Sequence, residues 1–381
     1  MTLRVGIDLH VVDGKYQGSR THVLELFSRV IDLSPEMQFF VFLDRPDSLA
    51  EFGTSWTREN VTRVRMPHAN PLVRYGWQLP RLQRRYDLNI LHTQHVMPLF
   101  LSCATAVTIH DILFERFPEY FTKTFVWRSR LLMRQAARAA SHVFTVSDYS
   151  KAEIGAAYNV PLSKMTVIHN GVDTEGFASP ADDSAYLQAR GLEARKYILT
   201  TGRLEPRKNH KALIRAYANL ACGEIPLVIV GQRDFGYSEL FKLIDTLGLL
   251  ERVHVLEDVD DIELKALYRQ AGMFAYPSFA EGFGMPPLEA MAAGTPVIVS
   301  NTTALPEVTG DAALLVDPHD VRSLMNAMMT LLVDPKLKEK LIVNGKQRAL
   351  RFSWSESASI VRRQYLRMAT TGSKVTSAEA P

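Results

Sequence analysis

The sequence predicts an α/β protein with two domains, each containing a parallel β-sheet covered by helices. A chain of 381 residues is too long for one ordinary hydrophobic core. In both halves, short apolar runs alternate with longer amphipathic stretches, which is the pattern of parallel strands with helices on both faces. Between the halves, residues 176–193 are mostly small or polar and lack a buried run, so we expect a linker there.

The first domain is expected over residues 1–175. Its strands are predicted at residues 3–9, 39–43, 89–93, 105–109 and 143–146. Gly18 lies in a turn before an amphipathic helix at about 22–33, and a glycine turn at a helix N-terminus can hold a phosphate. The turn lacks the Gly-x-Gly-x-x-Gly pattern, so the dinucleotide-binding fingerprint is absent.

The second domain is expected over residues 194–354. Its strands are predicted at residues 197–201, 227–230, 253–256, 273–276, 296–300 and 313–316. Helices are predicted at about 209–220, 238–247, 260–270, 287–293, 319–332 and 335–352. A further amphipathic helix is predicted at about 355–370, and the small, polar residues that end the chain are expected to fray.

Two glutamates flank a glycine loop between two buried strands of the second domain. Glu281 precedes Gly282 and Gly284, which would let the backbone approach a ligand closely, and Glu289 follows in the next helix. A helix N-terminus attracts anions, so two carboxylates beside it need an explanation. A ligand with hydroxyls as well as phosphates supplies one, whereas a capped, solvated helix start is the simpler alternative.

Arg203 and Lys208 follow the first strand of the same domain and precede a helix. A guanidinium fork and an ammonium can both bind a diphosphate, and fixed cations stabilise the charge that grows on a leaving diphosphate. A basic helix start on the surface is the alternative interpretation. In the first domain, His110 and Asp111 follow a strand, where ligands of parallel sheets bind, although a lone histidine is more often structural. His95 follows another strand and is a weaker candidate.

Three motifs together resemble the retaining, nucleotide-sugar-dependent glycosyltransferases of family 4. They are Glu-x7-Glu within EGFGMPPLEAMAAGTPVI, Gly-Arg-Leu-x-x-x-Lys-Asn at residues 202–209 and Thr-x-His-Asp at residues 108–111. The resemblance covers nearly the whole chain and implies the GT-B fold, in which two Rossmann-like domains face each other across a cleft. It also implies that the C-terminal helix packs back on the first domain.

The resemblance assigns roles to the candidate residues. Arg203 and Lys208 would bind the donor diphosphate, Glu289 the ribose hydroxyls, and Glu281 the sugar hydroxyls. The residues whose backbone N–H groups would help Glu281 are Phe283, Gly284 and Met285. In the first domain, the resemblance gives His110 a contact with the donor sugar, Asp111 an orienting or acceptor-binding role, and Gly18 a backbone contact with the diphosphate. The family's usual Gly-Gly-x-Gly is reduced here to Gln-Gly-Ser.

The implied activity is that of a hexosyltransferase that needs no metal and no other cofactor. The segment EGFGMPPLEAMA looks most like the corresponding segment of bacterial mannosyltransferases of lipopolysaccharide or exopolysaccharide assembly. GDP-mannose is therefore the expected donor, and a glycan or lipid-linked oligosaccharide is the expected acceptor. A front-face mechanism is preferred in such retaining enzymes, and double displacement stays open. Asp258-Val-Asp260 resembles a metal-chelating motif of another glycosyltransferase fold, but helix capping explains it here.

Two other functions fit parts of the pattern. One is a sugar-nucleotide epimerase with GT-B-like architecture, and the other is a non-catalytic module that binds nucleotide sugars. The basic pair together with Glu-x7-Glu argues against the epimerase. The binding module would keep Arg203, Lys208 and Glu289 but would not need His110.

Charge and cysteine content bound the partners and the compartment. The net charge of +3 gives no argument for nucleic acid, and two cysteines, Cys103 and Cys222, exclude a disulfide framework. With no signal peptide and no apolar run long enough for a membrane span, we expect a cytoplasmic protein. From Arg58 to Arg138 the chain holds thirteen Arg or Lys and five Asp or Glu, and Arg130, Arg134 and Arg138 share a helical stripe. A solvated face explains such a run, but it also suits peripheral contact with an anionic membrane on the inner face of the plasma membrane.

Overall fold

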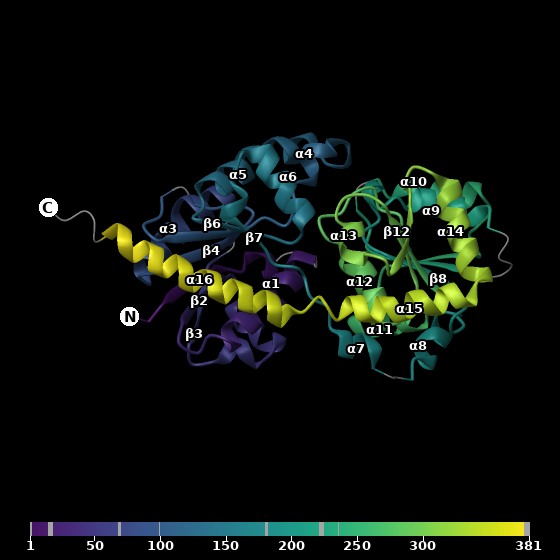
Figure 1. Cartoon of the computed structure of the whole chain (residues 1–381), viewed down its shortest axis with the longest axis horizontal. Helices are drawn as coiled ribbons and strands as arrows, with labels where there is room; N and C mark the ends of the chain where they lie inside the picture. Colours follow the sequence, from purple (N-terminus) through teal and green to yellow (C-terminus); the bar gives the residue numbers. More distant parts are fainter. Residues whose placement is uncertain are drawn as a thin grey trace. The chain divides into compact units, whose positions relative to one another are not determined.

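The computed structural model divides into two compact α/β units (Figure 1). It describes residues 2–13, 18–67, 70–98, 100–179, 182–220, 225–234 and 236–376, with no side chains for 371–376. The first unit is Met1–Gly171 with Ser353–Pro381, and the second is Val172–Phe352. Cys222 lies outside the described residues, and Cys103 is a free, half-buried thiol.

The first unit contains a seven-stranded parallel sheet in the order β3-β2-β1-β4-β5-β6-β7. Its strands are β1 (Arg4–Asp8), β2 (Gln38–Leu43), β3 (Val61–Arg65), β4 (Ile90–Gln94), β5 (Ala104–Thr108), β6 (His142–Thr145) and β7 (Met165–Val167). The five predicted strands are confirmed. The two edge strands were missed, because β3 exposes most of its side chains and β7 has three residues. Neither gives the continuous apolar run that identifies an interior parallel strand.

The helices of the first unit cover this sheet. They are α1 (Gly18–Asp32), α2 (Pro71–Val73), the π-helix η4 (Arg74–Gln78), α3 (Leu79–Arg85), α4 (Leu113–Arg116), α5 (Lys123–Ala139), α6 (Asp148–Tyr158) and α16 (Trp354–Thr376). Short 3₁₀ turns are η1 (His10–Asp13), η2 (Pro46–Phe52), η3 (Thr54–Thr57), η5 (Pro118–Tyr120) and η6 (Leu162–Lys164).

Helix α16 returns from the end of the chain to the first unit. It packs against α1 and against β4 and β5, as its yellow ribbon shows in Figure 1. Tyr365 is fully buried, and its hydroxyl lies 2.6 Å from Nδ1 of His92 on β4. The helix begins at Trp354 and continues to Thr376, so the predicted end at about residue 370 was too early. The last five residues, 377–381, lie outside the described residues.

The second unit contains a six-stranded parallel sheet in the order β10-β9-β8-β11-β12-β13. All six predicted strands are confirmed, as β8 (Ile198–Thr201), β9 (Leu227–Val230), β10 (Val253–Leu256), β11 (Met273–Tyr276), β12 (Val297–Ser300) and β13 (Ala313–Val316). The helices are α9 (His210–Ala218), α10 (Ser238–Thr246), α11 (Asp261–Gln270), α12 (Met285–Ala292), α13 (Leu305–Thr309), α14 (Val321–Val333) and α15 (Pro335–Ala349), with the 3₁₀ turn η7 (Pro206–Lys208).

The predicted linker at 176–193 is wrong, because this stretch forms part of the second unit. It carries α7 (Thr174–Ala178) and α8 (Ser184–Ala189), which pack on α11. Phe177 and Leu187 are each buried, and Asp183 accepts hydrogen bonds of 2.6 and 2.9 Å from Arg269. Single apolar residues in short helices do not produce the run that signals a buried element, so the sequence pattern concealed them.

The predicted fold class is confirmed, since each unit is a parallel sheet with helices on its faces. The strand order reverses between β1 and β4 in one sheet and between β8 and β11 in the other. In parallel α/β sheets the ligand crevice lies at this reversal, beyond the carboxyl ends of the strands. Among the helices described here, none is long and apolar enough to cross a bilayer.

Candidate functional site

The loops after β8 and β11 meet at the reversal point of the second sheet, and they carry most of the predicted donor-binding residues. The loop after β8 contains Arg203 and Lys208, and the loop after β11 contains Glu281. The two loops are joined by a hydrogen bond of 2.9 Å from the backbone N–H of Phe279 to the carbonyl oxygen of Arg207.

Glu281 is the centre of this site, with 7% of its surface exposed. Its Oε1 accepts hydrogen bonds from Lys208 Nζ at 2.8 Å, the Tyr276 hydroxyl at 2.9 Å and the Ser278 hydroxyl at 2.6 Å. Its Oε2 lies 2.9 Å from Nη1 of Arg207. Burial alone would raise the pKa of Glu281, but Arg207 and Lys208 beside it lower that pKa to about 2. The carboxylate is therefore ionised and fixed at physiological pH.

Lys208 forms an ion pair with Glu281 in this structure. Its Nζ also donates to the Tyr276 hydroxyl at 2.5 Å and lies 5.0 Å from the centre of the Tyr276 ring. The side chain is 11% exposed, and burial lowers the pKa of Lys208 although Glu281 opposes the shift. The two residues to which the resemblance gives the diphosphate and the sugar thus form one ion pair in this structure.

Arg207 was missed by the sequence analysis. Its Nη1 donates to the carbonyl oxygen of Ala280 at 2.6 Å, and its Nη2 binds Glu205 at 2.5 Å. An arginine next to a lysine before a helix is typical of an exposed basic helix start, so nothing in the pattern indicated that it is buried. The signal that could have found it is the pairing of Glu205 and Arg207 two residues apart in a short turn.

Arg203 follows β8 and forms a separate ion pair. Its Nη1 lies 2.8 Å from Oδ2 of Asp234, which follows β9, and both side chains are about one third exposed. Arg203 is therefore at the same sheet edge as Lys208 and is more accessible to a ligand.

Glu289 lies on α12 and contacts a different set of residues. Its Oε2 accepts a hydrogen bond of 2.9 Å from Tyr268, whose hydroxyl lies 2.7 Å from Oγ1 of Thr201 at the end of β8. Burial raises the pKa of Glu289 to about 7, and the Tyr268 hydrogen bond opposes that shift without cancelling it. Glu289 therefore changes charge near neutral pH, whereas Glu281 does not. Neither Tyr268 nor Thr201 was predicted as a site residue.

The entry of α12 is set by Gly284. This residue has φ of 112°, caps the helix and precedes Met285, its first residue. The backbone conformation favours glycine, and an added Cβ would lie 2.7 Å from Cδ2 of Leu305, which would have to shift. Phe283 is buried, with its ring 5.6 Å from that of Phe352. The three residues predicted to offer backbone N–H groups thus lie together at a helix N-terminus.

In the first unit, His110 and Asp111 follow β5 as predicted. The His110 ring lies 4.4 Å from the ring of His22 and 5.1 Å from that of His95. His22 is held by Asn170, with 2.7 Å between Nδ1 and Oδ1. Burial lowers the pKa of His110 well below its ordinary value and lowers those of His22 and His95 to about 4. All three are therefore neutral at physiological pH.

Three further predictions have structural outcomes. Asp111 accepts a hydrogen bond of 3.2 Å from the backbone N–H of Leu113, so part of its bonding capacity serves the start of α4. Asp260 caps α11 by accepting from Ile262 and Glu263 at 2.9 and 2.8 Å, which confirms the capping interpretation. Gly18 is the first residue of α1, which starts earlier than predicted, and the turn residues 14–17 lie outside the described part of the chain.

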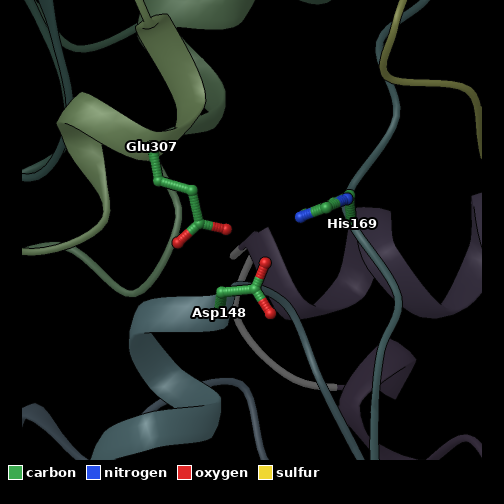
Figure 2. A group of neighbouring side chains, drawn as sticks. All are labelled: Asp148, His169 and Glu307. Atoms are coloured by element: carbon green, nitrogen blue, oxygen red, sulfur yellow. The ribbon is translucent and has the colours of Figure 1, made fainter.

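An acidic residue and a histidine also lie close together in the first unit. Figure 2 shows Asp148 at the start of α6 and His169 after β7. One carboxylate oxygen of Asp148 and one ring nitrogen of His169 lie within 4.8 Å of each other. The figure also labels Glu307 of α13, which belongs to the second unit. An Asp–His pair with one exposed member does not by itself make a metal site, and we assign it none.

Comparisons with known proteins agree with this arrangement of elements. A family model described as Glycosyl transferases group 1 matches residues 184–348, and another described as Glycosyltransferase Family 4 matches residues 16–176. The chain is 36% identical to O-antigen chain mannosyltransferase B of Escherichia coli over 251 residues, which is 65% of this chain and 66% of that protein. It is 34% identical to O-antigen chain mannosyltransferase RfbU of Salmonella typhimurium over 241 residues, 63% of each chain. The matches therefore span just under two thirds of these relatives.

A structural comparison addresses the fold alone. The structure of HepE from Anabaena in complex with UDP-glucose matches with a TM-score of 0.75 and 20% sequence identity, covering 97% of this chain and 100% of that one. The two family models together account for both α/β units, and their order along the chain is that of the two sheets. The chain therefore belongs to the family 4, group 1 glycosyltransferases, and its fold is GT-B.

Proposed function

We propose that this protein transfers mannose from GDP-mannose to a hydroxyl of a glycan or lipid-linked oligosaccharide in the assembly of a bacterial surface polysaccharide. The observation that carries the proposal is the group of Lys208, Arg207 and Glu281 at the reversal point of the second sheet, with Arg203 and Glu289 at the same edge. Cations for a diphosphate and carboxylates for hydroxyls are what a nucleotide sugar requires.

Each of these residues binds a different part of the donor. Arg203 and Lys208 bind the diphosphate and stabilise the negative charge that grows on the leaving oxygen. Glu289, when ionised, accepts hydrogen bonds from the ribose hydroxyls. Glu281 orients the sugar hydroxyls beside the N–H groups at the entry of α12. In the first unit, neutral His110 contacts the donor sugar and Asp111 orients it or the acceptor.

Transfer proceeds with retention and without a metal ion. Glu281 is a poor nucleophile, because its oxygens accept from Arg207, Lys208, Tyr276 and Ser278 and its pKa is about 2. This supports a front-face reaction in which the leaving phosphate takes the proton of the acceptor hydroxyl. Fixed cations supply the charge that a metal would otherwise provide, so transfer is expected to persist in EDTA.

The names of the relatives support the choice of donor sugar and acceptor. Both are described as O-antigen chain mannosyltransferases, with 36% and 34% identity to this chain. The HepE complex holds UDP-glucose, so the fold also accommodates other nucleotide sugars. The base and the sugar are therefore tested together.

A panel of nucleoside diphosphates and their sugars tests the donor. GDP and GDP-mannose are expected to raise the melting temperature of the protein by more than UDP and UDP-glucose, because a ligand that binds the native state stabilises it. Each donor is then assayed for transfer to a mannose-terminated glycan. Stabilisation by UDP with none by GDP would contradict the choice of donor, and loss of a UDP-N-acetylglucosamine signal without an acceptor would indicate an epimerase.

The first unit contacts an anionic membrane surface through α5. Trp127 and Leu131 are 72% and 61% exposed on this helix, and Arg128 and Arg134 are exposed beside them. The helix contains no acidic residue. Of the predicted arginine stripe, Arg130 pairs with Glu115 at 2.7 Å and Arg138 donates to the Tyr158 carbonyl, so these two also serve the unit itself. Exposed apolar residues flanked by arginine match the interface of an anionic bilayer.

Vesicle sedimentation at low salt tests this contact. The wild-type protein is expected to bind vesicles of phosphatidylglycerol and phosphatidylcholine more tightly than vesicles of phosphatidylcholine alone. Trp127→Ser with Leu131→Ser should weaken binding, whereas Val333→Ser, at a 69% exposed position of the second unit, should not. Equal, weak binding of both vesicle types by the wild type would contradict the contact.

A further inference from the structure

Arg207 is an arginine held inside the second unit. Its side chain is 15% exposed, and it bridges the turn η7 to the loop after β11. One edge of its guanidinium binds Glu205 at 2.5 Å, and Nη1 binds both the Ala280 carbonyl and Oε2 of Glu281, at 2.6 and 2.9 Å. A planar fork shared by three acceptors restrains the position of each of them.

The two oxygens of Glu281 have different partners. Lys208, Tyr276 and Ser278 all donate to Oε1, while Arg207 holds Oε2. Two-sided restraint fixes the plane of the carboxylate, which a set of donors to one oxygen does not. Arg207 therefore determines the orientation in which Glu281 faces its ligand.

Lys208 would be shared between Glu281 and the diphosphate if it also binds the donor. Its Nζ is bound to Glu281 in this structure, and a bound donor would compete for the same ammonium group. The guanidinium of Arg207 binds Glu205, the Ala280 carbonyl and Glu281. These three contacts hold it beside the Glu281 carboxylate. It is the cation that stays with the carboxylate.

We propose that Arg207 is a positioning residue for Glu281, which it keeps ionised and correctly oriented while Lys208 binds the diphosphate of the donor. The inference rests on the proposed function, since it assumes that Lys208 and Glu281 bind the two ends of a nucleotide sugar. Arg207 itself does not touch the donor. It acts on the reaction through Glu281.

The charges around Glu281 give the proposal a pH signature. The charged or titratable groups at the carboxylate are Arg207, Lys208 and Tyr276, and Glu205 lies on the far side of Arg207. Burial favours the protonated form of Glu281, and the two cations hold its pKa near 2, below its ordinary value of 4.5. Removing Arg207 leaves burial less opposed and raises the pKa of Glu281.

The test compares Arg207→Gln and Arg207→Lys with Arg190→Gln in the full-length protein. Arg190 is the matched control, because it forms a fork on Glu263 at 2.7 and 3.1 Å in the same unit but outside the site. The measurements are the kcat and KM for transfer, the affinity for GDP, and the melting temperature without ligand as a function of pH.

We expect Arg207→Gln to lower kcat by about 100-fold, the cost of a small misplacement of a catalytic group. GDP affinity should change little, because Lys208 and Arg203 remain. Arg207→Lys keeps a cation but loses the fork, so we expect a loss of about 10-fold with a nearly normal pH dependence. Arg190→Gln should lower the melting temperature without changing kcat.

The pH dependence of melting separates this proposal from the proposed function. A carboxylate with a lowered pKa stabilises the fold above its ordinary pKa, and that stability is lost as pH falls toward the lowered value. The loss between about pH 4.5 and pH 2 should be smaller in Arg207→Gln than in the wild type, because the folded pKa of Glu281 then lies closer to its unfolded value. The Arg190→Gln curve should lie at lower temperature but keep the wild-type dependence on pH. If the wild type transfers no sugar, the proposed function fails and these curves still decide whether Arg207 keeps Glu281 ionised.

Normal kcat together with a wild-type pH dependence in Arg207→Gln would overturn the proposal. Should that variant fail to fold, Arg207→Lys decides. A folded Arg207→Lys protein with wild-type kcat shows that the fork is not needed, whereas lowered kcat with unchanged GDP affinity supports the positioning role.

Discussion

The environment of the Glu289 carboxyl group raises its pKa to near neutral pH. Its raised pKa of about 7 means that half of the molecules lack the ionised acceptor when the pH equals that value. Since ribose hydroxyls donate to the ionised form, we expect the KM for the donor to rise as pH falls below about 7. Measuring KM from about pH 5.5 to pH 8.5 checks this, and a KM independent of pH would contradict the assignment of Glu289 to the ribose.

The same residue affects stability with a sign that can be worked out. Its pKa in the folded protein, about 7, lies above the ordinary value of 4.5, so folding favours the protonated form. Ionisation of Glu289 therefore costs stability, and that cost is fully present above about pH 7 and absent below about pH 4.5. Glu289→Gln should raise the melting temperature at about pH 8 and change it little at about pH 5, while it weakens donor binding. An equal effect at both pH values would show that the carboxylate is not buried.

The Tyr276 hydroxyl contributes to the site through two charged partners. It donates to Glu281 and accepts from Lys208 at 2.9 and 2.5 Å. Tyr276→Phe should lower transfer and cost about 1–3 kcal/mol of stability, because hydrogen bonds to charged groups are strong. Tyr217→Phe is the matched control, since that hydroxyl donates to the Ile225 carbonyl at 2.7 Å within the core of the same unit. Equal activity of the two variants in a transfer assay would contradict a role for Tyr276 in the site.

At the scale of elements, the loop before α12 depends on one backbone conformation. Gly284 has φ of 112°, and an added Cβ would approach Leu305 to 2.7 Å. Gly284→Ala is expected to destabilise the protein by about 1–3 kcal/mol and to weaken donor binding, because the strain displaces the entry of the helix. The control is Gly76→Ala, where an added Cβ meets nothing within 4 Å. Chemical denaturation measures both, and a normal free energy of unfolding for Gly284→Ala would show that the loop tolerates the side chain.

How far the sequence predicted these elements depended on their packing. Strands buried on both faces, such as β9 and β11, form unbroken apolar runs and were predicted to the residue. The helices α7 and α8 were missed because each buries few residues, so their burial follows from tertiary packing and not from a local pattern. Helix α16 was predicted to end early because its last turns are polar, and propensity does not mark where such a helix stops.

The candidate site shows the same division. Arg203, Lys208, Glu281 and Glu289 were identified because family motifs mark them. Arg207 and Tyr276 carry no such mark, and their importance comes from contacts across two loops that are more than sixty residues apart in the chain. The pairing of Lys208 with Glu281 could not be predicted from their separate assignments to phosphate and sugar.

At the scale of the whole molecule, the C-terminal helix α16 is part of the first unit and packs against its sheet and α1. Tyr365 and Val361 on α16 are fully buried in the first unit, although the whole second unit, Val172–Phe352, separates α16 from the other elements of the first unit in the chain. Ending the chain at residue 352 should therefore lower the melting temperature of the first unit and leave the second largely intact. Ending it at residue 376 is the control. Calorimetry resolves the two transitions, and an unchanged first-unit transition in the shorter chain would contradict the structural role of α16.

The central claim is that the carboxyl edge of the second sheet binds a nucleotide sugar for transfer to an acceptor. The most direct measurement is NMR of GDP-mannose incubated with the protein and a mannose-terminated glycan, in the presence of EDTA. We predict release of GDP and a new α-linked mannose signal, both lost in Lys208→Met. Consumption of GDP-mannose without a glycosylated product, a β-linked product, or no reaction with any nucleotide sugar would contradict it.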